Sequence, residues 1–106
     1  MALDCYNVAT SFPKHEIFGI ESQIRRAGSS IGANIAEGCR RSGNGEFQRF
    51  LQMAMGSASE LENHLLLARD LQFLHKEKHS AIENKVIEIK KMLATLIRKI
   101  DIDRYS

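Results

Sequence analysis

Apolar residues recur every three or four positions along most of this chain, a spacing that places them on one face of an α-helix. Over residues 19–41 the repeat is carried by Ile20, Ile24, Ala27, Ile31 and Ile35. Over residues 46–71 it is carried by Phe47, Phe50, Ala54, Ala58, Leu61, Leu65, Ala68 and Leu71. The pattern therefore predicts two long helices, the second of roughly seven turns.

The last part of the chain predicts another long helix, from near Lys76 to about Ile102. Its apolar residues alternate gaps of four and three, which is the a/d seam of a coiled coil or helical bundle. The seam consists of Ile82, Val86, Ile89, Leu93, Leu96 and Ile100, and a second stripe consists of Ile87, Met92 and Ile97. We expect one stripe to fill the core of the chain and the other to contact a neighbouring subunit.

A short helix is predicted at the beginning of the chain, from Ala2 to Thr10. Helical spacing puts Leu3, Tyr6 and Ala9 on one side of it. The sequence Ser-Phe-Pro at residues 11–13 ends this helix, because a residue that precedes proline is kept out of the α region. A helix this short is marginal unless it packs against the others.

The clearest break in the pattern is the sequence Ser-Gly-Asn-Gly at residues 42–45. Either Ser42 or Asn44 is suited to cap the helix that follows, and Glu46 suits the positive end of that helix. Short connections between long helices make them antiparallel neighbours. The sequence therefore predicts an all-α protein, an up-down antiparallel four-helix bundle with a short first helix, as a single domain over residues 1–106.

Small residues form two patches in the middle of the chain, at residues 27–36 and 54–59. A glycine inside a helix costs about 1 kcal/mol relative to alanine, and the first patch contains two, Gly28 and Gly32. Their presence indicates that another backbone approaches closely. We expect the two patches to face each other.

Composition places the chain among soluble globular proteins, because 43% of its 106 residues are hydrophobic and 26% are charged. No apolar run is long enough for a membrane span, and we expect no secretory leader, because no charged and apolar segment of that kind precedes the predicted first helix. The cysteines, Cys5 and Cys39, form no CxxC pair and are typical of reduced thiols. We therefore expect a cytoplasmic protein. Its net charge of +2 does not by itself indicate nucleic-acid binding, although a symmetric oligomer would multiply it.

The sequence displays no catalytic constellation. His75 and His79 are four positions apart, a spacing at which two histidines can share a metal ion, but they do not form an HExxH motif. Lys76 and Lys78 stand beside them, which favours a solvated helix start. The glycines form no phosphate-binding loop, because no GK[ST] motif follows them. We expect no enzymatic activity, no cofactor and no metal.

Five arginines are the candidate contacts for a phosphate backbone: Arg25, Arg26, Arg40, Arg41 and Arg49. Guanidinium groups match the geometry of phosphate oxygens, which favours a nucleic-acid-binding surface. The alternative is a structural role, because cations such as Arg40 and Arg41 stabilise the end of a helix. Lys90 and Lys91 are weaker candidates.

Asn34 is an unusual polar residue, because it falls beside two isoleucines of the buried stripe. Burying an amide costs free energy unless its hydrogen bonds are made. A polar network with Glu37, Arg41 and Glu60 would satisfy it, and such networks can fix register or oligomeric state. The alternative is that this position is locally exposed.

Several longer motifs resemble one family over nearly the whole chain. They are FPKHE at 12–16, QIRRA at 23–27, SIGANIAEG at 30–38 and AMGSASEL at 54–61, with Glu46-Phe47 and Phe50-Leu51. With these motifs the chain resembles the four helix bundle protein family. That family is also called the rRNA intervening-sequence protein family, after its reading frames inside inserts of bacterial large-subunit rRNA genes.

The resemblance implies a four-helix protomer that assembles as a ring-like homopentamer. Related proteins are accessory factors of the reverse transcriptases of diversity-generating retroelements, and they engage nucleic acid and the polymerase through a basic surface. By position, the family's characteristic polar residues are Arg25, Arg26, Asn34, Glu37 and Glu60. The expected partners are thus RNA or DNA and a reverse transcriptase or other protein. The alternative is a protein-interaction module with structural arginines.

The resemblance also bears on the first helix. Family members usually carry a lead-in before the position of Ala2 that lengthens this helix. The first helix of this chain is therefore expected to be shorter than theirs.

Overall fold

The computed structural model describes residues 1–10, 12 and 19–105, without the side chains of residues 104 and 105. These residues form four helices and no strand, and they confirm the predicted all-α fold. The helices are α1 (Ala2–Thr10), α2 (Ile20–Arg40), α3 (Asn44–Asp70) and α4 (Lys76–Tyr105). The predicted boundaries agree to within three residues. Of the predicted helix stop at residues 11–13, Phe12 is described and buried, while Ser11 and Pro13 lie outside the described residues.

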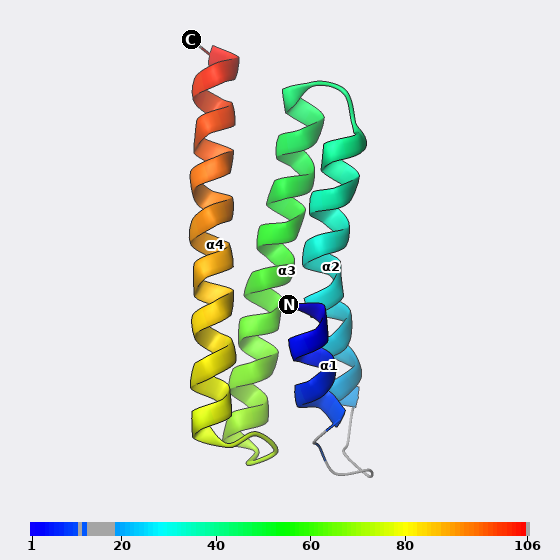
Figure 1. Ribbon diagram of the computed structural model, residues 1–106, viewed down its shortest axis with the longest axis vertical. Coiled ribbons are helices and arrows are strands. Elements are labelled where there is room, and N and C mark those ends of the chain that lie inside the picture. The colour runs from blue at the N-terminus through cyan, green and yellow to red at the C-terminus, as the bar shows by residue number, and fades with distance from the viewer. Residues whose placement is uncertain (11, 13–18, 106) are drawn as a thin grey trace.

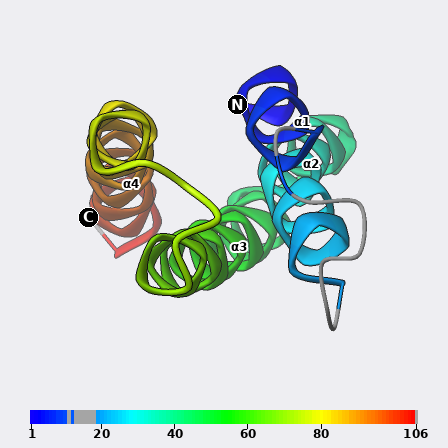
Figure 2. The same ribbon diagram turned by 90° about the horizontal axis from the view of Figure 1, so that it is seen from below.

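The four helices run up and down along one long axis (Figure 1). The molecule measures 51 × 21 × 18 Å along its principal axes. Helix α3 lies between α2 and α4 and packs against both, and α1 packs against α2 (Figures 1 and 2). Because α1 has nine residues and α2 has 21, α1 covers only the lower part of α2 in Figure 1.

The core follows the predicted apolar repeats of α2 and α3. The most deeply buried side chains of these two helices are Ile24, Leu51, Ala54, Ala58, Leu61, Leu65 and Ala68. Burying apolar surface contributes about 25 cal/mol per Å², so this shared face of α3 supplies much of the stability of the bundle. Polar contacts join α4 to α3 and to α1, with Lys90 donating to Glu62 at 2.6 Å and Lys85 donating to Asp4 at 3.0 Å.

The two apolar stripes of α4 do not divide into one buried and one exposed stripe, as the sequence predicted. In its upper half, Leu93, Ile97 and Ile100 are buried, so Ile97 belongs to the core. Leu96 of the predicted core seam is 36% exposed, and Met92 of the second stripe is 70% exposed. The reason is that α4 packs on α3 alone at this height, which leaves its other side uncovered.

Of the three apolar residues that helical spacing places on one side of α1, only Ala9 is buried. Leu3 and Tyr6 are 71% and 52% exposed, whereas Cys5 and Ala9 are buried. The helix rests on Gly28 of α2, where a Cβ atom would lie 2.9 Å from the Cβ of Cys5. A glycine is therefore required beneath Cys5, and this close approach decides which side of α1 faces inward. Burial also raises the pKa of the Cys5 thiol to about 11, which keeps it protonated.

The small-residue patches of α2 and α3 meet in part. Ser30 and Ser57 form a hydrogen bond of 2.9 Å between their hydroxyl groups, and Ala54 and Ala58 are fully buried. The glycines behave differently from the prediction. Gly28 faces α1, while a Cβ atom added at Gly32 or Gly56 would meet nothing within 4 Å.

The turn between α2 and α3 depends on Gly43, not on the predicted caps Ser42 or Asn44. Gly43 occupies the position before α3 with a φ of 91°, and no side chain caps the helix. Residues with a Cβ atom rarely adopt this φ, so glycine takes the place of a capping side chain. The prediction of a side-chain cap is wrong, whereas Glu46 lies in the first turn as expected.

We predict that Gly28→Ala loosens α1 while Gly32→Ala does not. Overpacking at residue 28 should cost about 1–3 kcal/mol and expose Cys5. In a Cys39→Ser background, the alkylation rate of Cys5 measures this opening. The matched control Gly32→Ala should leave that rate unchanged and should gain up to about 1 kcal/mol in helix propensity. Equal alkylation rates in the two variants would contradict the proposed contact between α1 and Gly28.

Candidate nucleic-acid interface

The five candidate arginines lie in two separate places. Arg40 ends α2, Arg41 follows it and Arg49 lies near the start of α3, so these three gather where α2 joins α3 (Figure 1). Arg25 and Arg26 lie in the N-terminal part of α2. The helical rise separates Arg25 from Arg40 by roughly 22 Å along the axis. The fold therefore does not bring all five arginines to one site.

Phe50 is the centre of the first group. Its ring is buried, and the guanidinium carbons of Arg41 and Arg49 lie 5.2 and 4.6 Å from the ring centroid. Cation–π attraction over an aromatic ring holds both guanidinium groups at the end of the bundle. We call the following residues the Phe50 cluster: Glu37, Arg40, Arg41, Glu46, Arg49 and Phe50.

Two glutamates pair with the arginines of the Phe50 cluster. Glu37 accepts a hydrogen bond from Arg40 at 2.7 Å and forms an ion pair with Arg41 at 2.9 Å. Glu46 accepts hydrogen bonds from Arg49 at 3.1 and 3.3 Å. The three arginine side chains remain 48–75% exposed. The cluster thus presents three guanidinium groups and two carboxylates at the surface, with a surplus of one positive charge.

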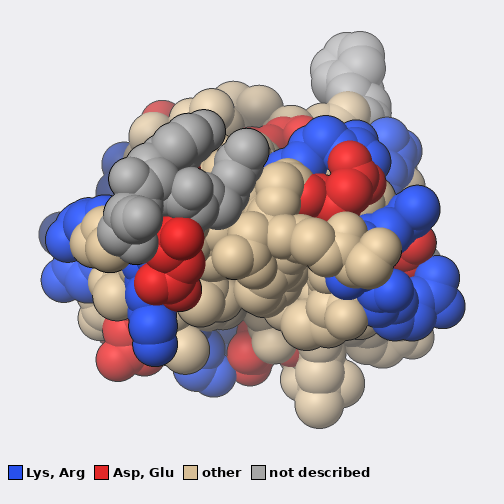
Figure 3. All heavy atoms as spheres, turned by 90° about the horizontal axis from the view of Figure 1, so that it is seen from above, with Lys and Arg blue, Asp and Glu red and all other residues tan. Residues whose placement is uncertain are grey.

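The ionic contacts of Glu46 shift its titration. The hydrogen bond from Arg49 and the charge of Arg49 lower the pKa of Glu46, and the charge of Arg41 lowers it further. The same pair raises the pKa of Arg49. Both groups are therefore charged at neutral pH. On the end of the molecule where α2 joins α3, basic and acidic side chains are interleaved (Figure 3).

The second group, Arg25 and Arg26, is exposed and lies near α1. The guanidinium carbon of Arg25 lies 5.9 Å from the ring centroid of Tyr6. Neither arginine forms an ion pair with a described residue. These two side chains are free to meet a phosphate, but they lack the convergent arrangement of the Phe50 cluster.

The predicted polar network around Asn34 is divided into three parts. Asn34 donates to the backbone oxygen and the hydroxyl of Ser30, at 2.9 and 3.1 Å. Glu37 belongs to the Phe50 cluster, and Glu60 pairs with His64 at 3.3 Å. Asn34 is half-buried and reaches α3 only through Ser30.

His75 and His79 do not face a common site. His75 is exposed, whereas His79 is 2% exposed and lies 3.9 Å from Glu83. Within residues 1–10, 12 and 19–103, no three histidine, cysteine or acidic side chains form a group that could hold a metal ion. A search of the described helices likewise finds none long and apolar enough to span a bilayer.

Sequence reasoning did not identify Tyr6 and Phe50 as partners of arginines. Phe50 falls on the apolar repeat and was assigned to the core, which is confirmed. Its contact with Arg49 is local, and an aromatic residue beside an arginine is a signal that could have suggested it. Its contact with Arg41 depends on the turn at Gly43, which the sequence pattern does not define.

Two comparisons with known proteins gave matches. The model of the family described as 23S rRNA-intervening sequence protein matches residues 1–95. A crystal structure of a protein of unknown function from the S23 ribosomal protein family, from Bacteroides thetaiotaomicron VPI-5482, is similar with a TM-score of 0.85. The two chains are 31% identical, and the match covers 91% of this chain and 90% of the other. The search of curated proteins found no match.

We predict that Arg49→Gln raises the pKa of Glu46 toward its ordinary value. The lowered pKa means that the pair stabilises the fold above the ordinary pKa of glutamate and that this contribution is lost as the pH falls through the lowered value. Carboxyl NMR titration measures the change directly. Arg40→Gln is the matched control. Because Arg40 pairs with Glu37, this substitution should leave the pKa of Glu46 unchanged. Identical titration of Glu46 in both variants would refute the pairing.

Proposed function

This chain belongs to the 23S rRNA-intervening sequence protein family, and we propose that it is a non-enzymatic accessory or scaffold protein that binds a nucleic-acid backbone through the Phe50 cluster. The observation that carries the proposal is the convergence of Arg40, Arg41 and Arg49 at one end of the bundle. Arg25 and Arg26 are separate, secondary contacts in this proposal.

The geometry of the Phe50 cluster supports phosphate binding for two reasons. First, the ring of Phe50 fixes Arg41 and Arg49, so little side-chain freedom is lost when they bind a ligand. Second, a phosphate presents oxygens to a guanidinium fork much as a carboxylate does. Because exposed ion pairs are weak, a phosphate can displace Glu37 or Glu46 at little cost.

The proposal includes assembly of several copies, as a homopentamer in line with the family resemblance. One cluster carries a surplus of one positive charge, which is weak for a nucleic-acid site. A ring of copies would multiply this charge and repeat the cluster around an axis. Large apolar side chains exposed on α3 and directly after it support self-association, namely Met53, Leu66, Leu67 and Leu71.

The second candidate function is a protein-interaction module whose arginines are purely structural. The observation that favours it is that all three arginines of the Phe50 cluster already have a carboxylate or ring partner within the chain. In that case the partner is another protein, such as a reverse transcriptase, and substitution of the arginines lowers stability without affecting nucleic-acid binding.

We predict that Arg40→Gln/Arg41→Gln/Arg49→Gln weakens binding to a structured RNA and to a DNA duplex. Fluorescence anisotropy over a salt series measures the affinity, on protein whose assembly has been checked by light scattering. The slope of log affinity against log salt is negative, and if three phosphate contacts are lost per copy it should become shallower by roughly two to three units for each copy that binds. Arg25→Gln/Arg26→Gln should have a smaller effect.

Arg69→Gln is the matched control for this experiment. Arg69 is an arginine at the opposite end of α3, paired with Asp70 at 3.2 Å. Its substitution removes the same charge and should leave both affinity and salt slope unchanged. If the wild-type protein binds neither nucleic acid at low salt, or if the triple variant binds as well as Arg69→Gln does, the nucleic-acid function is rejected in favour of the interaction module.

A further inference from the structure

Glu37 is the most enclosed charged side chain of the Phe50 cluster, and it contacts two arginines at once. Its Oε2 accepts a hydrogen bond from Arg40 at 2.7 Å, and its Oε1 lies 2.9 Å from a guanidinium nitrogen of Arg41. The side chain is 30% exposed, compared with 46% for Glu46. A single carboxylate therefore lies between two guanidinium groups and uses both of its oxygens.

The stability of α2 does not account for a carboxylate at residue 37. Glu37 lies in the last turn of α2, which ends at Arg40. The carbonyl end of a helix carries partial negative charge, which favours cations and disfavours a carboxylate. Glu46 differs, because it lies in the first turn of α3, where a carboxylate is favoured. Since exposed ion pairs stabilise a fold only weakly, the pairing of Glu37 with two arginines has a better explanation in what those arginines bind.

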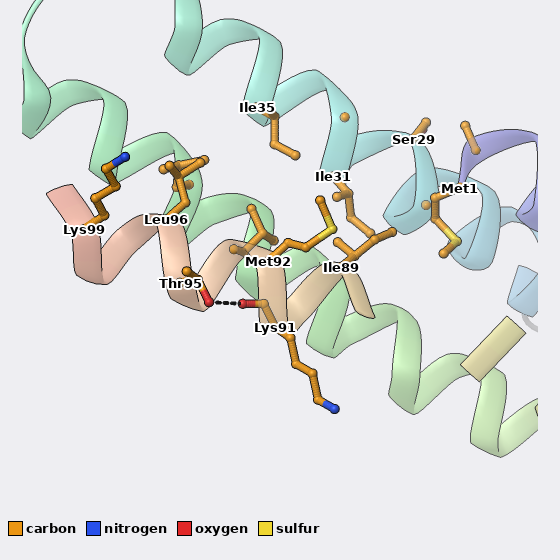
Figure 4. A pocket seen from close by; sticks show the side chains of 15 residues that line it. Met1, Ser29, Ile31, Ile35, Ile89, Lys91, Met92, Thr95, Leu96 and Lys99 are labelled. Atoms are coloured by element: carbon orange, nitrogen blue, oxygen red, sulfur yellow. Dashed lines mark hydrogen bonds between the residues drawn. The ribbon is translucent and has the colours of Figure 1, made fainter. Parts of the chain in front are cut away.

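Glu37 lies on the outer surface of the bundle and not in its apolar pocket. Ile35 of α2 lines the pocket between α2 and α4 (Figure 4). Glu37 is two residues further along the helix, which turns it by roughly 200° around the axis. Neither Glu37 nor any other residue of the Phe50 cluster lines that pocket. The carboxylate is therefore within reach of a ligand that approaches Arg40 and Arg41 from solvent.

A phosphate and the carboxylate of Glu37 would use the same donors. Both present two oxygens to the N–H groups of a guanidinium fork, and both are negatively charged. A phosphate that takes these donors must displace Glu37. A phosphate that uses the remaining N–H groups of Arg40 or Arg41 stays close to the carboxylate and is repelled by it. In either case Glu37 lowers the affinity of the two arginines for phosphate.

We propose that Glu37 is an internal competitor for phosphate, whose carboxylate occupies the position between Arg40 and Arg41 that a backbone phosphate takes when nucleic acid binds. The inference rests on the proposed nucleic-acid function and adds to it a residue that limits binding. It requires that removing the charge of Glu37 strengthens binding, whereas a carboxylate that only orients the two arginines for their ligand would make binding weaker when it is removed.

Glu37→Gln tests the proposal, because glutamine keeps the size of the side chain and one oxygen acceptor while removing the charge. Measured by fluorescence anisotropy at low salt with the RNA and DNA duplexes, its affinity should rise roughly fivefold for each copy that binds. Glu46→Gln breaks one ion pair instead of two and should give roughly twofold. Asp70→Asn is the matched control, since it removes the same charge from the pair with Arg69 at the opposite end of α3, and it should leave the affinity unchanged. Circular dichroism and light scattering should show the same helix content and assembly in all variants.

A titration with inorganic phosphate tests the competition without nucleic acid. Followed by the side-chain Nε NMR signals of Arg40 and Arg41, half-saturation should occur at a roughly fivefold lower phosphate concentration in Glu37→Gln than in the wild type. The proposal is overturned if the wild type binds a duplex and Glu37→Gln binds it no more tightly than Asp70→Asn does. If neither the wild type nor Glu37→Gln binds a duplex, the nucleic-acid function is rejected. The phosphate titration then decides alone, and equal half-saturation in the two proteins overturns the proposal.

Discussion

The packing of α3 between α2 and α4 is the constraint on which the rest of the structure depends. One face of α3 is built from small and apolar residues, including the fully buried Ala54 and Leu61, and both neighbours meet it. Helix α1 is added outside this frame, on Gly28 of α2. The position of α3 therefore determines where the Phe50 cluster forms.

Apolar periodicity was sufficient to predict the helices, because each long helix repeats its pattern over many turns. It was not sufficient where a single contact between two helices determines which side of a helix is buried. Helix α1 has nine residues, so its apolar pattern repeats too few times to define a buried face. The close contact with Gly28 of α2 turns Cys5 inward, while Leu3 and Tyr6 stay exposed. In α4, Leu96 fits the heptad seam but is partly exposed, because among the described helices α4 packs chiefly against α3.

For the candidate site, the sequence identified the type of residue, but the fold determined which of these residues lie together. Residue type alone identified the five arginines, but the length of α2 separates Arg25 and Arg26 from the other three. The turn at Gly43 brings Arg41 over the ring of Phe50. The sequence indicates a break at residues 42–45, but it does not define the backbone conformation of Gly43 that directs the chain there. Asn34 and Glu60 were expected in one network and instead have local partners, Ser30 and His64, at helical spacing.

The central claim is that nucleic acid contacts the end of the bundle where α2 joins α3. The most direct measurement is the change in backbone amide NMR signals when a short RNA duplex is added to the assembled protein at low salt. The account predicts that residues 37–50 shift most, and that the shifts disappear at high salt, because phosphate contacts are screened by ions. Shifts confined to α4 or to the surface around Arg26, or no shifts at all, would contradict it.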